Sequence, residues 1–134
     1  MIFVLEDNQD RINWFKQNFG AENITVTDNP IEAMGLLMIN EYSAIFLDHD
    51  LGDSQNTGEG YLRGRYGDGI DLVKQMVKFL PQIDTPIFIH SLNDPGAKNM
   101  YTLLNNAGYN VDILNFLQLV KASNAKTLRD FFIN

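Results

Sequence analysis

The sequence predicts an α/β fold, with one doubly wound parallel sheet of five strands and helices on both faces. Short apolar or β-branched runs alternate with longer segments in which apolar residues recur every three or four positions. Gly, Asn, Asp and Pro stand at the junctions between these segments. Such alternation implies right-handed crossovers and therefore parallel strands. The chain of 134 residues is long enough to bury one core without disulfides.

The first predicted unit is a strand followed by a helix. Ile2–Leu5 is a continuous apolar run, which is typical of a strand buried on both faces. Polar residues follow it, and then Ile12, Phe15 and Phe19 recur at helical spacing until Gly20 ends the helix.

Two further strand and helix units follow. Residues 23–27 are β-branched and predict a strand, and residues 28–30, Asp-Asn-Pro, predict the start of a helix. Residues 43–47 form a third apolar strand. Its helix is predicted over 70–80, opened by the Asp-Gly pair at 68–69.

The last two units carry weaker patterns. Residues 85–89 predict a fourth strand, with Pro86 tolerated at its beginning. Asp94 and Pro95 suit the cap and first position of a helix that reaches about residue 106. A fifth strand is expected over 110–116, and a final helix from Ser123 or Asn124.

A glycine-rich segment interrupts the alternation. Residues 52–67, GDSQNTGEGYLRGRYG, lie between the third strand and its helix. Loops longer than ~12 residues inside a compact domain are usually functional or disordered. We therefore expect a single domain over 1–134 with an insertion loop at about 52–67.

Composition excludes several classes of function. Ten Lys and Arg against seventeen Asp and Glu give a net charge of −7, which argues against a broad nucleic-acid-binding face. There are no cysteines, so thiol catalysis and thiolate metal sites are excluded. The N-terminus lacks a signal-peptide pattern, and no apolar run approaches the ~20 residues that span a bilayer. We expect a soluble, cytoplasmic protein without membrane contact; its protein partners cannot be inferred.

The polar residues at the strand ends define a candidate site. In an open parallel sheet, ligands bind beyond the carboxyl ends of the strands, where the strand order reverses. With the order 2-1-3-4-5, the first, third and fourth strands are neighbours and their ends meet. These ends carry Glu6 and Asp7, then Asp48, His49 and Asp50, then His90, Ser91 and Asn93.

Crowded carboxylates repel one another, so they must take up protons or bind a cation. An oxygen donor set without cysteine favours Mg²⁺, with Mn²⁺ as a second choice, and Mg²⁺ in proteins often bridges to phosphate. The expected ligands are Glu6, Asp7, Asp48 and Asp50. Alternatively, the first two could cap the following helix and Asp50 could form a turn.

The other polar residues of the site also have two interpretations. His49 points away from its neighbours if the strand continues, which favours a structural role. His90 could be structural or catalytic. Ser91 and Asn93 could form a turn or bind phosphate, and Arg63 and Arg65 could be solvated charges or phosphate ligands. No GxGxxG or Walker pattern occurs.

With these residues in place, the chain resembles the receiver domains of two-component response regulators, which have the flavodoxin-like strand order 2-1-3-4-5. The acid pair Glu6 and Asp7, the phosphoacceptor position Asp48 and the hydroxyl position Ser91 match the receiver pattern. The expected lysine after the fifth strand is missing, because residues 114–116 read Leu-Asn-Phe and Lys121 lies further on.

Two strings resemble a divergent branch, the cyclic-phosphate processing receiver domains. The first is Asp-His-Asp-Leu at 48–51. The second spans 90–100, and its matching positions are His90, Ser91, Asn93, Gly96, Asn99 and Met100.

This resemblance implies a metal-dependent phosphoesterase acting on a cyclic phosphate, such as a 2′,3′-cyclic RNA end or a cyclic nucleotide. Asp48, His90 and Ser91 are its expected catalytic residues, and Asn93, Arg63 and Arg65 its phosphate ligands. Asp48 would be a metal ligand or a nucleophile. The alternatives are a stand-alone receiver phosphorylated at Asp48, and a module that binds a phosphorylated ligand without turnover.

Overall fold

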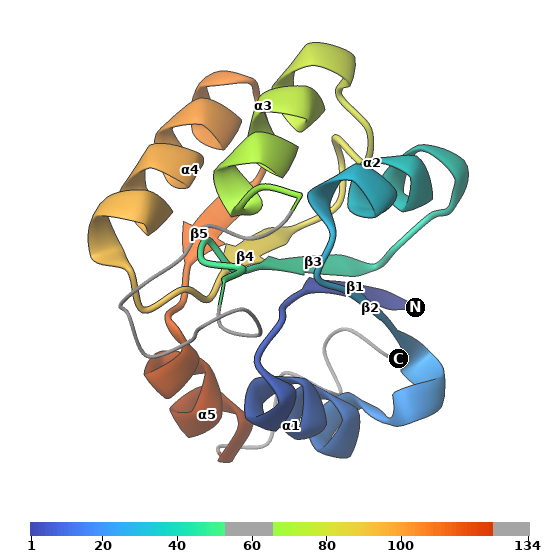
Figure 1. The fold of residues 1–134 in the computed structure, drawn as a ribbon, viewed down its shortest axis with the longest axis vertical. Helices are drawn as coiled ribbons and strands as arrows, with labels where there is room; N and C mark the ends of the chain where they lie inside the picture. Colours follow the sequence, from blue (N-terminus) through green and yellow to red (C-terminus); the bar gives the residue numbers. More distant parts are fainter. Residues whose placement is uncertain (53–65, 125–134) are drawn as a thin grey trace.

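The computed structural model describes residues 1–52 and 66–124. Its five parallel strands form one sheet in the order β2-β1-β3-β4-β5, which confirms the predicted fold class (Figure 1). The strands are β1 (Ile2–Leu5), β2 (Ile24–Thr27), β3 (Ala44–Leu47), β4 (Ile87–Ile89) and β5 (Val111–Ile113). The helices are α1 (Gln9–Phe19), α2 (Pro30–Ile39), α3 (Gly69–Phe79), α4 (Asp94–Asn106) and α5 (Phe116–Asn124), with a short 3₁₀ turn η1 (Ala21–Asn23) after α1.

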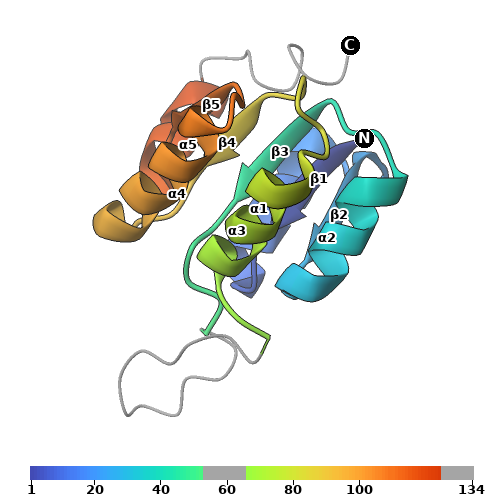
Figure 2. The ribbon, with the colours of Figure 1, turned by 90° about the horizontal axis from the view of Figure 1, so that it is seen from above.

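The helices cover both faces of the sheet. Figure 1 shows α1 and α5 on one face and α2, α3 and α4 on the other. In the view of Figure 2, the strands run side by side from β2 at one edge to β5 at the other. Alternate residues of the central strands enter the two cores: Phe3 and Ile45 pack under α2, α3 and α4, whereas Val4 and Phe46 pack under α1 and α5. The strand ends are therefore fixed between two packed layers.

The end of the chain differs from its prediction. A strand was expected over 110–116 and a helix from Ser123 or Asn124, but β5 ends at Ile113 and α5 already begins at Phe116. Asn115 explains the early start, because its Oδ1 accepts a hydrogen bond from Gln118 N at 3.0 Å while the Gln118 side chain accepts from Asn115 N at 2.9 Å. Capping of this kind turns the apolar run into a helix.

The start of α4 also differs in detail. Asp94 was expected as the cap, but Asn93 holds that position, and its Oδ1 accepts a hydrogen bond from Gly96 N at 3.0 Å. Asp94 lies inside the first turn, directly before Pro95. One of the predicted phosphate ligands is thus also the cap of a helix.

Most of the glycine-rich segment, residues 53–65, lies outside the described residues, and with it the predicted phosphate ligands Arg63 and Arg65. Among the described residues, no helix combines the length and the apolar character needed to cross a membrane.

Candidate functional site

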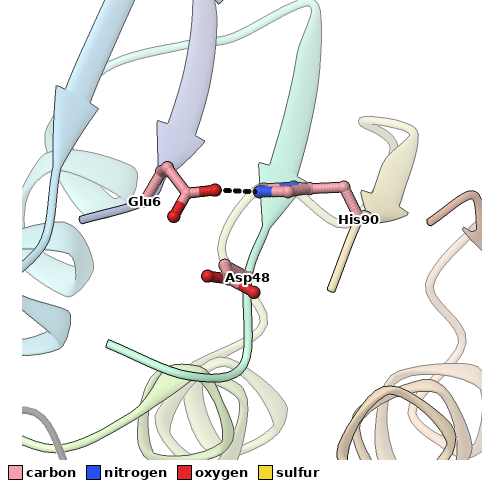
Figure 3. A group of neighbouring side chains, drawn as sticks. All are labelled: Glu6, Asp48 and His90. Carbon is pink, nitrogen blue, oxygen red and sulfur yellow. Dashed lines mark hydrogen bonds and ion pairs between the residues drawn. The ribbon is translucent and has the colours of Figure 1, made fainter. Parts of the chain in front are cut away.

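Three buried polar side chains meet at the carboxyl ends of neighbouring strands. Glu6 follows β1, Asp48 follows β3 and His90 follows β4, and Figure 3 shows them facing one another. One ligand atom from each lies within 4.8 Å of those from the other two, and all three residues are buried. The hydrogen bonds from Asp48 N to Leu5 O, at 3.1 Å, and from His90 N to Leu47 O, at 3.0 Å, extend the parallel pairing into the site.

Glu6 is surrounded by hydrogen-bond donors. Its Oε1 accepts from Arg11 Nε at 2.7 Å and lies 3.0 Å from His90 Nε2. Its Oε2 accepts from the backbone N–H groups of Asp7 and Asn8, at 3.0 and 3.2 Å, and from Arg11 Nη2 at 3.2 Å. Burial acts to raise the pKa of Glu6, but the hydrogen bonds and charges of His90 and Arg11 outweigh it and lower this pKa from 4.5 to about 2. Glu6 is therefore an ionised carboxylate that positions Arg11 and His90 through hydrogen bonds.

Arg11, which the sequence motifs do not mark, completes this cluster. It lies in the first turn of α1, where Asn8 Oδ1 accepts a hydrogen bond from Arg11 N at 3.1 Å. A basic side chain in a first helical turn faces the unfavourable end of the helix dipole. An arginine at this position, one turn after a pair of acids, is the sequence signal that could have identified it.

Asp48 has far fewer donors than Glu6. Its Oδ1 accepts a hydrogen bond from His49 N at 2.9 Å. Its Oδ2 is buried, makes no hydrogen bond with the residues that the structure describes, and lies 3.6 Å from Arg11 Nη2. Burial, followed by the charge of Glu6, raises the pKa of Asp48 well above 3.8, and the opposing effect of Arg11 is smaller. Asp48 is thus a buried acid for which the nearby charge of Arg11 does not outweigh burial and the charge of Glu6.

Gly69 fixes the backbone of Asp48. A Cβ placed on Gly69 would lie 1.9 Å from the Asp48 carbonyl oxygen, so no side chain fits at this position. The Gly69 N–H donates a hydrogen bond to His49 O at 2.8 Å. The Asp-Gly pair at 68–69 therefore starts α3 directly against the main chain of the site.

His90 is oriented by Glu6. Because the Glu6 carboxylate only accepts hydrogen bonds, His90 carries its proton on Nε2 in this contact. The buried Nδ1 has no hydrogen-bond partner. Phe15 packs edge-on against the imidazole, with 5.2 Å between ring centroids. The Glu6 carboxylate and the Phe15 ring therefore fix the orientation of the imidazole.

A second polar group lies beside the first and joins two loops. Asp50 Oδ1 lies 2.6 Å from His49 Nδ1 and accepts a hydrogen bond from Asn93 Nδ2 at 3.0 Å. The His49 ring packs against Gly96, where a Cβ would approach it to 2.6 Å. His49 is thus hydrogen bonded to Asp50, and its structural role stays a prediction. Ser91 is buried, and its Oγ accepts a hydrogen bond from Asn93 N at 3.1 Å.

A cavity of about 260 Å³ opens over both groups. It is lined by Arg11, Asp48, Asp50, His90, Ser91, Leu92 and Asn93. A larger hollow of about 630 Å³ lies near the residues that lead into β3 and β4, but none of the predicted site residues lines it. The smaller cavity is therefore the candidate site.

Residues 1–106 match the family described as "Cyclic-phosphate processing Receiver domain". The chain belongs to this family. The cyclic-phosphate processing receiver domain is also similar in fold to solved receiver domains. The receiver domain of the Francisella response regulator 1452 is 25% identical, with a TM-score of 0.59 over 92% of this chain and 93% of that one. No curated protein matches the sequence.

Two more distant solved structures support the same fold. A response regulator from Colwellia psychrerythraea is 17% identical, with a TM-score of 0.62 over 96% of this chain and 95% of that one. A CheY-like receiver domain protein from Methanospirillum hungatei JF-1 is 15% identical, with a TM-score of 0.60 over 93% of this chain and 90% of that one.

This cyclic-phosphate processing receiver domain departs from the receiver pattern after β5. Leu114 is partly buried in the core under α1 and α5, and Asn115 leads into α5. Lys121 is exposed in the last turn of α5. The side chains that follow β5 therefore supply no lysine at the position where receivers have one.

The donor set fits a hard divalent cation. Asp48 Oδ2 is a buried oxygen without a hydrogen bond, and Asp50 lines the same cavity. Glu6 could bind a cation only by giving up one of its donors. Residues 1–52 and 66–124 contain two groups of possible metal ligands, one of Glu6, Asp48 and His90 and the other of His49, Asp50 and Asp68. Asp7 belongs to neither group and does not line the cavity. For all four acids a role as metal ligand stays a prediction.

Proposed function

We propose that the protein is a metal-dependent phosphoesterase that opens a cyclic phosphate diester, such as a 2′,3′-cyclic RNA end or a cyclic nucleotide. The observation that carries the proposal is the imidazole of His90 beside Asp48 in one cavity, held by a fully ionised Glu6. Membership of a family described as processing cyclic phosphates supports the substrate class.

Asp48 and Asp50 would hold the cation, because both line the cavity and Asp48 Oδ2 has no hydrogen bond. Bound Mg²⁺ or Mn²⁺ would supply charge neutralisation at the phosphoryl group and lower the pKa of a coordinated water. Occupation of the site would also remove the penalty of a buried carboxylate at Asp48.

His90 would move the proton. In its neutral form, with Nε2–H donated to Glu6, His90 has an Nδ1 lone pair that can accept a proton from the attacking water and return it to the leaving oxygen. Glu6 would stabilise the imidazolium that forms in between, as a carboxylate does for a catalytic histidine. Ser91 and Asn93 line the cavity beside it and would hydrogen bond the phosphoryl oxygens.

The test is a screen of 2′,3′-cyclic and 3′,5′-cyclic nucleotides with Mg²⁺ or Mn²⁺, followed by separation of the ring-opened product. We expect turnover that EDTA, Asp48→Asn and His90→Ala each abolish. The matched control is Asp84→Asn, which changes an exposed acid outside the cavity and should leave turnover unchanged. Full activity in EDTA or in either site variant would exclude the proposal.

A second candidate function is that of a phosphoacceptor receiver. Asp48 ends β3 at the phosphoacceptor position, its Oδ2 makes no hydrogen bond, and the fold is that of response-regulator receivers. The absence of a lysine after β5 argues against it. Beryllofluoride with Mg²⁺ should then produce amide shifts in NMR spectra that Asp48→Asn abolishes. Saturable binding of a cyclic nucleotide that is recovered intact would instead indicate a binding module without turnover.

A further inference from the structure

The charges of the cavity raise a question about substrate binding. A phosphate diester is a monoanion, and the cavity wall already contains the carboxyl groups of Asp48 and Asp50. Like charges in a poorly solvated cavity repel strongly, so the wall needs positive charge where the diester binds. Among the lining residues in the described part of the chain, Arg11 is the one Lys or Arg.

Arg11 is hydrogen bonded to Glu6 but also reaches toward Asp48 and the cavity. Its guanidinium forks onto both Glu6 oxygens, and its Nη2 also lies 3.6 Å from Asp48 Oδ2, which is too long for a hydrogen bond. The side chain is 21% exposed, whereas that of Glu6 is fully buried. Arg11 therefore has one edge anchored in the protein and its charge at the cavity wall.

Two further contacts keep the guanidinium in place. Asn8 caps the helix through Arg11 N, which fixes the backbone of the residue. The guanidinium carbon lies 6.0 Å from the centre of the Phe116 ring. A side chain held in this way loses less conformational entropy when a ligand binds, which favours Arg11 as a preorganised contact.

We propose that Arg11 is a substrate-binding residue that contacts a nonbridging oxygen of the phosphate diester. A diester has two nonbridging oxygens, so one can face the cation at Asp48 while Arg11 donates to the other. A guanidinium can keep its two hydrogen bonds to Glu6 and still offer further N–H groups to the diester, whereas an ammonium group is a single point charge. The inference rests on the proposed function, and it assigns phosphoryl recognition to α1.

Binding of dimethyl phosphate, an inert diester monoanion, tests the inference without any turnover. The protein is titrated with dimethyl phosphate in Mg²⁺ buffer, and the ¹⁵N–¹H signal of the Arg11 side chain is followed by NMR. The signal of its Nη groups, assigned by its loss in Arg11→Lys, should shift saturably, because these groups gain the diester as a hydrogen-bond partner while Nε stays on Glu6. Sodium chloride at equal ionic strength should not move it.

The Kd values of substituted proteins for dimethyl phosphate are the second measurement of the same experiment. Loss of one charged hydrogen bond weakens binding about tenfold or more, so Arg11→Gln and Arg11→Lys should both raise the Kd for dimethyl phosphate. Lys16→Gln removes an exposed charge from the same helix and should leave the Kd unchanged. Arg11→Lys keeps a positive charge beside the buried Glu6 carboxylate, so we expect it to fold. Its Kd therefore tests the inference even if Arg11→Gln does not fold.

The outcomes separate the inference from the proposed function. Equal Kd values for wild type and Arg11→Lys, with an unmoved Arg11 signal, overturn the inference and leave the phosphoesterase proposal in place. If the wild type does not bind dimethyl phosphate in Mg²⁺ at all, the inference is overturned, and the turnover screen decides the phosphoesterase proposal.

Discussion

The ends of β1 and β3 each bury an acid, and the two acids have opposite properties. Glu6 is hydrogen bonded by two side chains and two backbone N–H groups, and its pKa falls to about 2. Asp48 receives one backbone N–H, and burial together with the charge of Glu6 raises its pKa. Burial alone therefore does not decide the charge of an acid. The donors around it do: His90 after β4 and the start of α1 supply them to Glu6, whereas Asp48 receives one backbone N–H.

The contrast suggests a division of roles. At the end of β1, the charge of Glu6 is already compensated by protein groups without any ligand, so this acid stabilises the fold. At the end of β3, the ionised form of Asp48 is disfavoured, and an added cation would compensate its charge. This acid is therefore suited to ligand binding. The following changes test this division, from the largest expected effect to the smallest.

Glu6→Gln should cause the largest loss of stability. The substitution removes the charge that holds Arg11 and His90, and breaking a buried ion pair by removing one partner costs about 3 to 5 kcal/mol. Urea unfolding followed by circular dichroism measures the change. Glu41→Gln, at an exposed acid, should differ from the wild type by no more than about 0.5 kcal/mol. A loss below about 1 kcal/mol for Glu6→Gln would contradict a stabilising role of the β1 end.

Gly69→Ala should be the next most damaging change. The new methyl group would meet the Asp48 carbonyl oxygen, a backbone atom that cannot move without shifting the end of β3. Overpacking of this kind costs about 1 to 3 kcal/mol. Gly35→Ala is the matched control, because no atom lies within 4 Å of the added Cβ and α2 should gain about 0.5 to 1 kcal/mol. Unchanged thermal unfolding of Gly69→Ala would show that the site tolerates a shifted Asp48.

Asp48→Asn should stabilise the metal-free protein at neutral pH, in contrast to Glu6→Gln. A raised folded-state pKa means that burying the ionised form is unfavourable, and each unit corresponds to about 1.4 kcal/mol. We expect a gain in stability, seen as a higher midpoint of urea unfolding with EDTA present. Asp84→Asn should show no such gain, and destabilisation by Asp48→Asn would contradict the assignment.

The pH dependence of these two acids should run in opposite directions. The stability that Glu6 contributes is present above its unfolded pKa of 4.5 and is lost as the pH falls toward about 2. The contribution of Asp48 is present below 3.8 and is lost as the pH rises through its raised folded pKa. The difference between Asp48→Asn and wild type should therefore be small at low pH and grow on approach to neutrality. A constant difference would exclude the raised pKa.

Added Mg²⁺ should give the smallest effect and should depend on Asp48. A ligand that binds only the folded state stabilises it by about 1.4 kcal/mol at ten times its Kd. Thermal unfolding of the wild type should shift upward with Mg²⁺, whereas Asp48→Asn should not respond. Equal shifts in both proteins would place the cation elsewhere.

Much of this arrangement could be predicted from the sequence, because it depends on local patterns. The apolar run Ile2–Leu5 and the Asp-His-Asp string after β3 identify strand ends, and a parallel sheet brings such ends to one edge. Opposite pKa shifts could not be predicted in this way, since they depend on which donors reach each acid. Arg11 shows why: its guanidinium contacts both acids only after α1 has packed on the sheet.

The errors at the end of the chain have a similar cause. After Gly108, β5 and α5 lie in one apolar run of the sequence. The spacing of its apolar residues does not show where the strand ends and the helix begins. The reciprocal hydrogen bonds of Asn115 and Gln118 decide the boundary. Likewise, both Asn93 and Asp94 are good caps by residue type, and only the contact between Asn93 and Gly96 N selects the first.

The contact between Glu6 and His90 joins residues that are 84 positions apart in the chain. During synthesis, β1 is therefore complete long before the imidazole that accompanies its acid exists. Until β4 docks beside β3, the Glu6 carboxylate lacks His90 as a partner, so its burial is unfavourable. This cost opposes premature closure of this end of the sheet. Loop-closure entropy for such a distant pair is large, and contacts of this range form slowly. Assembly of the site should thus coincide with the last stage of folding, and any truncation before β4 should leave it unformed.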